Sequence, residues 1–303
     1  MTGTALILGP TGRFGWNAMQ AFQTAGWTVH PFCRGQDDLK TLAATADVVV
    51  NGWNPLYTDW ASNVPQLTED VIAAVQGAEA TVIVPGNVYV FGPDVPSPWN
   101  PDSPHRATNP LGRIRCAMEQ RYREAGVRTI VLRAGDFLDT RASGNWFDRI
   151  MIKSLHKGIL TYPGDPAASH AWAFLPDLAR AAVTLAEKRH DLPIFSDVPF
   201  SGYTLTGQQL AQHLSIATGQ PIHVRPMAWW PIRALSPVWT MGRCLAEMRY
   251  LWDLPHRLDN TPLLSDFNPT PVDEALRQTI QGAGFAARST QTKRWRLAST
   301  TSS

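Results

Sequence analysis

The sequence predicts an α/β fold: a doubly wound parallel sheet covered by helices, with a smaller C-terminal lobe. In the first half of the chain, short apolar runs alternate with segments whose apolar residues recur at helical spacing, which is the pattern of βαβ units. The apolar runs 4–9 and 47–51 are almost continuous, as strands buried on both faces of a parallel sheet require. A glycine-rich segment separates the first strand from the first helix.

The expected elements follow in chain order. Strands are expected at 4–9, 28–32, 47–51, 81–85, 127–133, 159–162, 171–175 and 192–196. Helices are expected at 16–25, 37–45, 111–125, 146–156, 178–188, 206–218 and 271–281, with a longer one ending at 76. Pairing of the second strand should end near Pro31, which has no N–H to donate. Asp177 and Thr206 are the expected N-caps of their helices.

This element order divides the chain into two parts. Residues 1–140 should form the main domain, to which 171–200 return. Residues 141–170 and 201–285 should form the smaller lobe. Residues 286–303 are polar and rich in Ser and Thr, so we expect a flexible tail there.

Composition excludes several functional classes. The chain has 303 residues, with Lys+Arg 27 against Asp+Glu 25, a balance unlike that of a protein that neutralises nucleic-acid phosphates. Hydrophobic residues make up 44%, enough for a large core. The three cysteines, Cys33, Cys116 and Cys244, lie far apart, so we expect neither a disulfide framework nor a metal site and place the protein in a reducing cytoplasm. No uncharged apolar run approaches the ~18 residues of a membrane span.

The strongest functional signal is the glycine loop at residues 9–15, read GPTGRFG. Gly9 permits a tight turn, Gly12 lets a diphosphate approach the backbone, and Gly15 lets the helix pack closely on the strand. The helix N-terminus supplies unpaired N–H groups and the positive end of the helix dipole. An ordinary glycine-rich turn is the alternative, but the strand–loop–helix context favours a dinucleotide site.

The end of the second strand indicates which dinucleotide is preferred. An NAD site usually places an acidic residue there, about 20 residues after the loop, to bond the adenosine ribose. This chain instead has FCRG at 32–35, without a carboxylate. Arg34 could hold a 2′-phosphate, with Arg13 as a second candidate, because guanidinium groups match phosphate geometry. We therefore expect NADP(H) to be favoured over NAD(H), unless Arg34 is only a solvated loop charge.

Several further segments, in the same order, resemble motifs of the short-chain dehydrogenase/reductase superfamily, in its extended or atypical branch of NAD-dependent epimerases and dehydratases. These segments are DVVVNG (47–52), GNVYVFG (86–92), NPLGRIRCAME (109–119), LRAGD (132–136) and AFLPDLA (173–179). The resemblance covers residues 3–285 and implies a Rossmann-type domain with a C-terminal substrate lobe. It also allows a homodimer, since relatives commonly pair through two long helices.

The resemblance and the glycine loop together give a set of expected cofactor contacts. They are Gly9, Thr11, Gly12, Arg13, Phe14, Gly15, Arg34, Asn51, Gly52, Trp53, Pro85, Gly86, Arg115, Ala134 and Gly135.

The chain departs from the family where the chemistry should lie. The family uses a Ser or Thr, a Tyr and a Lys; the matching positions here are Asn87, Leu111 and Arg115. Leucine has no proton to give, and arginine stays charged. Arg115 could still hold a ribose or phosphate, and Asn87 could still donate to a carbonyl oxygen. Cofactor binding can therefore survive although the usual acid/base is missing.

Tyr89 is the provisional proton donor, because it lies two residues beyond Asn87 at the expected crevice. Arg115 nearby would lower the pKa of its phenol; the alternative is that Tyr89 only packs or binds substrate. Asp136 and His170 are weaker candidates. We expect His170 to be structural or at the rim, and His105, in the Pro-rich loop, to be solvated.

Twelve tryptophans are the one compositional oddity. Many lie in the second half or in expected crevice loops, where they either stack on a ligand or pack the core. Residues 227–252 mix Trp with Arg and could bind an anionic, partly apolar substrate or a partner protein. Scattered prolines and the lack of a long amphipathic helix argue against membrane binding. We expect an NADP(H)-dependent, epimerase-like oxidoreductase acting on an unidentified carbonyl or hydroxyl compound, sugar-like by resemblance. The alternative is a noncatalytic NADPH-binding sensor or assembly protein.

Overall fold

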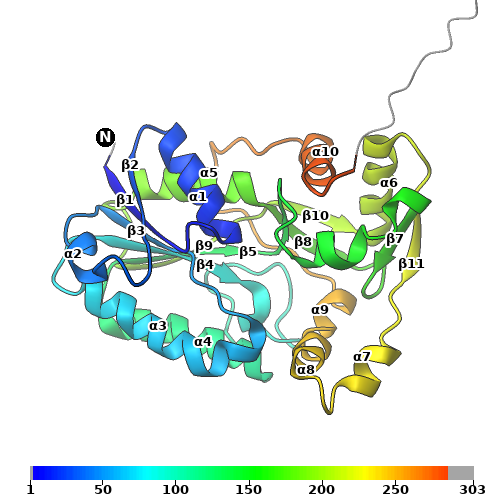
Figure 1. Ribbon diagram of the computed structural model, residues 1–303, viewed down its shortest axis with the longest axis horizontal. Helices are drawn as coiled ribbons and strands as arrows, with labels where there is room; N and C mark the ends of the chain where they lie inside the picture. The colour runs from blue at the N-terminus through cyan, green and yellow to red at the C-terminus, as the bar shows by residue number, and fades with distance from the viewer. Residues whose placement is uncertain (1–2, 286–303) are drawn as a thin grey trace, which may run out of the picture.

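The main sheet is built as the apolar runs predict. The computed structural model describes residues 3–285. Six parallel strands lie in the order β2-β1-β3-β4-β5-β9 (Figure 1). Their bounds are β1 Thr4–Leu8, β2 Thr28–Pro31, β3 Val48–Asn51, β4 Thr81–Asn87, β5 Thr129–Ala134 and β9 Phe195–Pro199. The strand order reverses between β1 and β3, which places a crevice at their carboxyl ends.

Helices cover both faces of this sheet (Figure 1). Along β1, Ala5 and Ile7 face the core that contains α1 (Arg13–Thr24) and α5 (Leu175–Glu187), whereas Leu6 and Leu8 face the opposite core. That second core contains residues of α2, α3 and α4, which span Leu39–Ala43, Trp60–Val75 and Pro110–Ala125. Alternation on a strand buried on both faces explains why residues 5–8 are all apolar.

A smaller lobe follows the main sheet. It holds the sheet β10-β8-β6 and the pair β11-β7. These strands are β6 Asp136–Leu138, β7 Ile159–Tyr162, β8 Ser169–Phe174, β10 Tyr203–Thr206 and β11 His223–Pro226. The helices are α6 Gly207–Thr218, α7 Trp230–Leu235, α8 Thr240–Glu247, α9 Tyr250–Asp253 and α10 Val272–Gly282. Among residues 3–285, no helix combines the length and apolar character needed to cross a membrane.

The structure corrects several expected boundaries in the second half. The segment 146–156 forms a π-helical turn at Phe147–Met151 and a 3₁₀ turn at Leu155–Lys157, because packing into the lobe core overrides the helical spacing. The sixth strand begins at Phe195 rather than 192, and Pro193 could not have donated to the ladder. Strands β6 and β10 were not predicted. The expected tail, 286–303, lies outside the described residues.

Asp177 does not cap its helix. Helix α5 begins at Leu175, with Pro176 in its first turn. The buried Asp177 carboxylate instead accepts hydrogen bonds from the amide and hydroxyl of Thr270, at 2.7 and 2.8 Å, and so holds the segment before α10. Thr206 caps α6 as predicted, in a capping box with Gln209.

Candidate functional site

The glycine loop turns as its sequence predicts. Gly9 has φ +70°, and the amide of Gly12 donates to the Gly9 carbonyl at 3.0 Å. A Cβ atom on Gly15 would lie 2.1 Å from that same carbonyl oxygen. Only glycine therefore lets α1 pack this closely against the loop.

A cavity of ≈ 490 Å³ opens over this loop. It is lined by Gly9, Thr11, Gly12, Arg34, Gly52, Trp53, Asn54, Pro55, Asn63, Gln66 and Leu67. Helix α1 begins at this cavity without a side-chain cap and without an acidic residue in its first turn. The first-turn amides and the positive end of the helix dipole are thus available to a bound anion.

Arg34 and Trp53 form one wall of the cavity. The guanidinium of Arg34 lies 4.7 Å from the centre of the Trp53 ring, in cation–π geometry. The nearby Asp37 carboxylate accepts from the Cys33 amide at 2.7 Å, so it is engaged within its own turn. Among the described residues that line the cavity there is no carboxylate.

Arg13 lies elsewhere. Its Nε and Nη2 donate to the carbonyl oxygens of Ser143 and Gly144 at 2.9 and 2.7 Å, and it is absent from the described lining. Arg13 therefore joins the start of α1 to the small lobe. Of the two arginines considered for a phosphate, the cavity contains Arg34.

Several other residues expected to contact the cofactor lie near the loop or at the strand ends, and some of them have a structural role of their own. Asn51 is buried, donates to the Tyr122 hydroxyl at 3.0 Å and accepts from the Trp53 amide, so it shapes the turn that carries Trp53. Phe14 is buried in the core beneath α1. At the ends of β4 and β5 lie Pro85, Gly86, Ala134 and Gly135. A Cβ on Gly135 would meet the Ala171 carbonyl oxygen at 2.1 Å, so close packing already requires that glycine.

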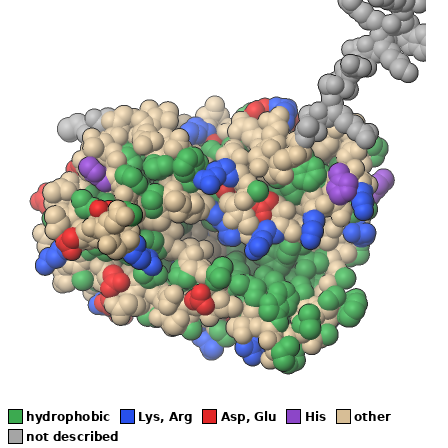
Figure 2. Space-filling model, viewed as in Figure 1, with side chains coloured by type: hydrophobic (Ala, Val, Ile, Leu, Met, Phe, Trp, Pro, Cys, Tyr) green, Lys and Arg blue, Asp and Glu red, His purple; other side chains and the backbone are tan. Residues whose placement is uncertain are grey.

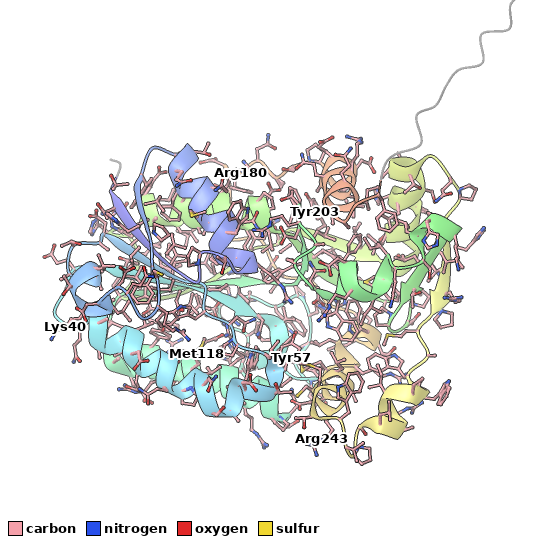
Figure 3. The ribbon with its side chains drawn as sticks, viewed as in Figure 1. Lys40, Tyr57, Met118, Arg180, Tyr203 and Arg243 are labelled. Atoms are coloured by element: carbon pink, nitrogen blue, oxygen red, sulfur yellow. The ribbon has the colours of Figure 1, made fainter. Side chains whose placement is uncertain are left out.

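The candidate catalytic residues Asn87 and Tyr89 lie together after β4. The Asn87 Oδ1 accepts from the Tyr89 amide at 3.0 Å, which leaves the Asn87 Nδ2 to donate elsewhere. The Tyr89 hydroxyl lies 2.7 Å from that of Tyr57, which the loop after β3 supplies. No motif pointed to Tyr57; its position after the third strand was the only signal in the sequence. Figure 3 shows Tyr57 between the sheet and the α8 region.

Arg115 does not activate Tyr89. Burial raises the pKa of Tyr89 well above its ordinary value, and the neighbouring Tyr57 phenol and Asp136 carboxylate act in the same direction. Arg115 and Tyr89 interact electrostatically, but burial outweighs this attraction, so the pKa of Tyr89 is raised overall. The buried Arg115 donates from Nη2 to the Pro85 carbonyl at 2.6 Å, and its guanidinium lies 5.5 Å from the centre of the Trp60 ring. Both phenols keep their protons at neutral pH, because burial also raises the pKa of Tyr57.

Leu111 takes the place of the family's tyrosine and is buried. Its amide donates at 2.6 Å to the Glu247 carboxylate of α8, which also accepts from Asn109 at 2.9 Å. The Glu247 carboxylate therefore accepts hydrogen bonds at the N-terminus of α4, where its negative charge complements the helix dipole. This contact, like the tyrosine pair, had no signal in the local sequence.

His170 is buried in the lobe core. Its Nε2 lies 2.7 Å from the Asp136 carboxylate, and its ring stacks on Trp252 with centres 4.2 Å apart. Asp136 also raises the pKa values of Tyr57 and Tyr89, so its charge acts on the tyrosine pair.

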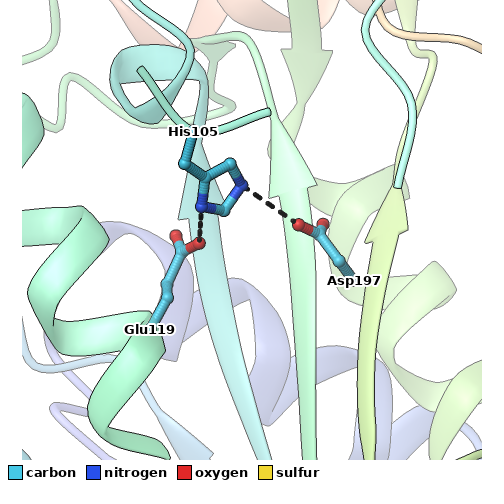
Figure 4. Close-up of side chains that lie close together, drawn as sticks. All are labelled: His105, Glu119 and Asp197. Carbon is cyan, nitrogen blue, oxygen red and sulfur yellow. Dashed lines mark ion pairs between the residues drawn. The ribbon is translucent and has the colours of Figure 1, made fainter. Parts of the chain in front are cut away.

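His105 is not simply solvated. Its two ring nitrogens lie 3.7 Å from Glu119 and Asp197 (Figure 4). The buried Arg133 already bonds both carboxylates, with Nη2 2.7 Å from Glu119 Oε2 and Nε 3.0 Å from Asp197 Oδ1. Although burial opposes it, the charges of Arg133 and His105 hold the pKa of Asp197 below its usual value. The cluster is thus an ion-pair network centred on Arg133.

Six of the eleven tryptophans within residues 3–285 are buried. Trp60, Trp99, Trp172 and Trp252 are fully buried, and Trp229 is 5% exposed. Only Trp53 belongs to the described cavity lining. Trp230 and Trp239 are instead exposed on the small lobe.

Comparison with solved structures shows which known proteins share this fold. No family model and no curated protein matches the sequence. The chain is similar to the solved UDP-glucose 4-epimerase of Brucella ovis in complex with NAD, with TM-score 0.71 and 16% identity over 95% of this chain and 100% of that one. It is also similar to UDP-glucuronic acid 4-epimerase of Bacillus cereus with UDP-glucuronic acid and NAD, with TM-score 0.69 and 13% identity over 93% and 99%. A nucleoside-diphosphate-sugar epimerase of Pseudomonas aeruginosa gives TM-score 0.65 and 16% identity over 92% and 96%. The chain therefore has the Rossmann-type fold of these epimerases, as its sequence predicted.

Proposed function

We propose that this protein is an NAD(P)(H)-binding, epimerase/dehydratase-like oxidoreductase that acts on a small carbonyl or hydroxyl compound. The observation that carries the proposal is the cavity over the uncapped start of α1, with Gly9, Gly12 and Gly52 in its wall. Backbone amides without side-chain competitors suit a diphosphate. The neighbours solved with NAD and UDP-sugars support both the cofactor class and a sugar-like substrate.

The residues that line the cavity fit the diphosphate and the adenosine half of a dinucleotide. The Gly12 backbone and the first turn of α1 would hold the diphosphate, and Trp53 with Arg34 would cover the adenosine half. The nicotinamide half would lie at the carboxyl ends of β4 and β5, beside Asn87. A bound nicotinamide would supply or accept a hydride there.

We further propose that NADP(H) is preferred. Arg34 lies on the cavity wall, whereas the described lining has no carboxylate to bond a free ribose 2′-hydroxyl. The NAD complexes among the neighbours favour the opposite preference, so this part of the proposal rests on Arg34 alone.

Titration of Trp fluorescence with NADPH and with NADH tests the preference. Arg34→Ala should weaken NADPH by about 10- to 100-fold, the value of a hydrogen-bonded charge, and leave NADH nearly unchanged. The matched control is Arg233→Ala, which removes another exposed arginine, on α7, outside the cavity. Equal binding of the two nucleotides by the unaltered protein would refute the preference while leaving dinucleotide binding intact.

The chain's own groups can orient a substrate oxygen and give it a proton. Asn87 Nδ2 would donate to that oxygen, and the Tyr57–Tyr89 hydroxyl pair would supply the proton. Because both phenols stay protonated at neutral pH, they act as acids rather than as preformed bases. Arg115 would support the ribose side of the site from beneath, through its bond to Pro85.

A noncatalytic NADPH-binding sensor or assembly protein is the second candidate. Leu111 in place of the family's tyrosine favours it, as does the raised pKa of Tyr89. Turnover of NADPH with a panel of carbonyl compounds separates the two. An enzyme should lose turnover in Tyr89→Phe while still binding the nucleotide; a sensor should bind it without turnover in either form.

A further inference from the structure

The small lobe exposes a group of large apolar side chains on α7 and on the turn that leads from α7 to α8. Trp230 is 70% exposed, Leu235 52%, Val238 86% and Trp239 41%. We call these four residues the α7–α8 patch. Figure 2 shows hydrophobic side chains gathered at the lower right, over these helices, with no acidic side chain among them in this view.

The patch belongs to a well-anchored segment. Beside the exposed residues, Trp229 and Ile232 are buried at 5% and 8% exposure and pack in the lobe core. The Trp229 Nε1 donates to the Pro163 carbonyl at 2.6 Å. The inward side chains of the segment are therefore packed and hydrogen-bonded. The exposure of the outward apolar side chains does not result from loose packing of the segment.

Exposed basic residues lie on the same chain segment as the patch. Residues 223–246 include exposed Arg225, Arg233 and Arg243 and contain no Asp or Glu. The next residue, Glu247, is held by Asn109 and Leu111 on α4. The segment thus combines exposed apolar side chains with a net positive charge, which complements a negatively charged surface.

We propose that the α7–α8 patch is a peripheral membrane-binding surface for a bilayer containing anionic lipids. Tryptophan favours the bilayer interface, and arginines bind anionic headgroups at about fivefold in affinity each. The sequence lacks the long amphipathic helix of a usual surface anchor. The structure supplies the same combination through two short helices, which present one apolar tip. The proposal is independent of the dinucleotide function.

Co-sedimentation with large unilamellar vesicles tests the proposal. We expect the protein to bind phosphatidylcholine vesicles that contain about one-third phosphatidylglycerol, and to bind pure phosphatidylcholine at least tenfold more weakly. Trp230→Ala and Val238→Asp should each weaken binding by about tenfold or more, and Arg233→Ala by about fivefold. Raising the salt to 0.5 M should weaken it further. Ile216→Asp is the matched control, because Ile216 is 66% exposed on α6, outside the patch.

Two results would overturn the proposal. One is that the protein binds anionic vesicles no more strongly than neutral vesicles, or that Ile216→Asp weakens binding to anionic vesicles as much as Val238→Asp does. The other is sedimentation velocity showing that Val238→Asp only dissociates an oligomer, with no vesicle binding by the unaltered protein; a second copy would then cover the patch. Thermal unfolding and nucleotide titration of each variant confirm that the fold is retained.

Discussion

Replacing Arg133 by methionine should destabilise the protein strongly. Arg133 is 1% exposed. It bonds the buried Glu119 and also Asp197, whose side chain is 8% exposed, and it donates to the Asn87 carbonyl at 2.6 Å. Methionine fills similar volume but leaves two buried carboxylates without their cation. Removing one partner of a buried ion pair costs about 3–5 kcal/mol in the free energy of unfolding. Because the same guanidinium holds Asn87, the variant should also impair the candidate site.

Urea unfolding followed by Trp fluorescence measures this cost. The matched control is Arg121→Met, since Arg121 pairs with Glu69 on the surface, with side chains 42% and 47% exposed, and should cost less than about 1 kcal/mol. The difference between Arg133→Met and the unaltered protein should shrink in acid. The pKa of Asp197 is lowered by folding, so its contribution is present above its usual value of 3.8 and is lost as the pH falls through the folded pKa. Equal costs for the two variants would refute this account of the cluster.

Three further predictions concern single side chains. Gly15→Ala places a methyl group 2.1 Å from the Gly9 carbonyl oxygen, so it should displace α1, lower the melting temperature and abolish nucleotide binding; unchanged titration curves would contradict the loop geometry. Burial and the charge of His170 lower the pKa of His256 to about 3, so this ring is neutral when folded and binds a proton more readily when unfolded. Its contribution to stability is present above pH 6.5 and lost as the pH falls towards 3, and His256→Gln should flatten urea-unfolding free energies across that interval. Tyr57→Phe removes the hydroxyl that lies 2.7 Å from the buried Tyr89 hydroxyl, so it should lower the free energy of unfolding by about 1 kcal/mol in the same assay. An unchanged free energy of unfolding would mean that a water or another group bonds the Tyr89 hydroxyl.

The sequence predicted the parts of this structure that depend on neighbouring residues. The strand, glycine loop and helix at 4–24 are encoded by a continuous apolar run and by glycines at fixed spacing. The cap at Thr206 is encoded by a residue three positions later. Because each of these signals is local, the sequence alone is enough to place them.

Long-range packing decided the rest. Strands β6 and β10 have three and four residues and exist because both pair with β8. Tyr57 reaches Tyr89 across 32 positions, and Glu247 reaches Leu111 across 136. The pKa of Tyr89 rises because the phenol is buried, which no spacing of residues reveals.

Calorimetric titration of the purified protein with NADPH and with NADH tests the central claim most directly. We expect saturable binding of one nucleotide per chain, with NADPH the tighter, and loss of that binding in Gly15→Ala. Absence of heat and of fluorescence change with both nucleotides, in a protein that unfolds cooperatively, would contradict it.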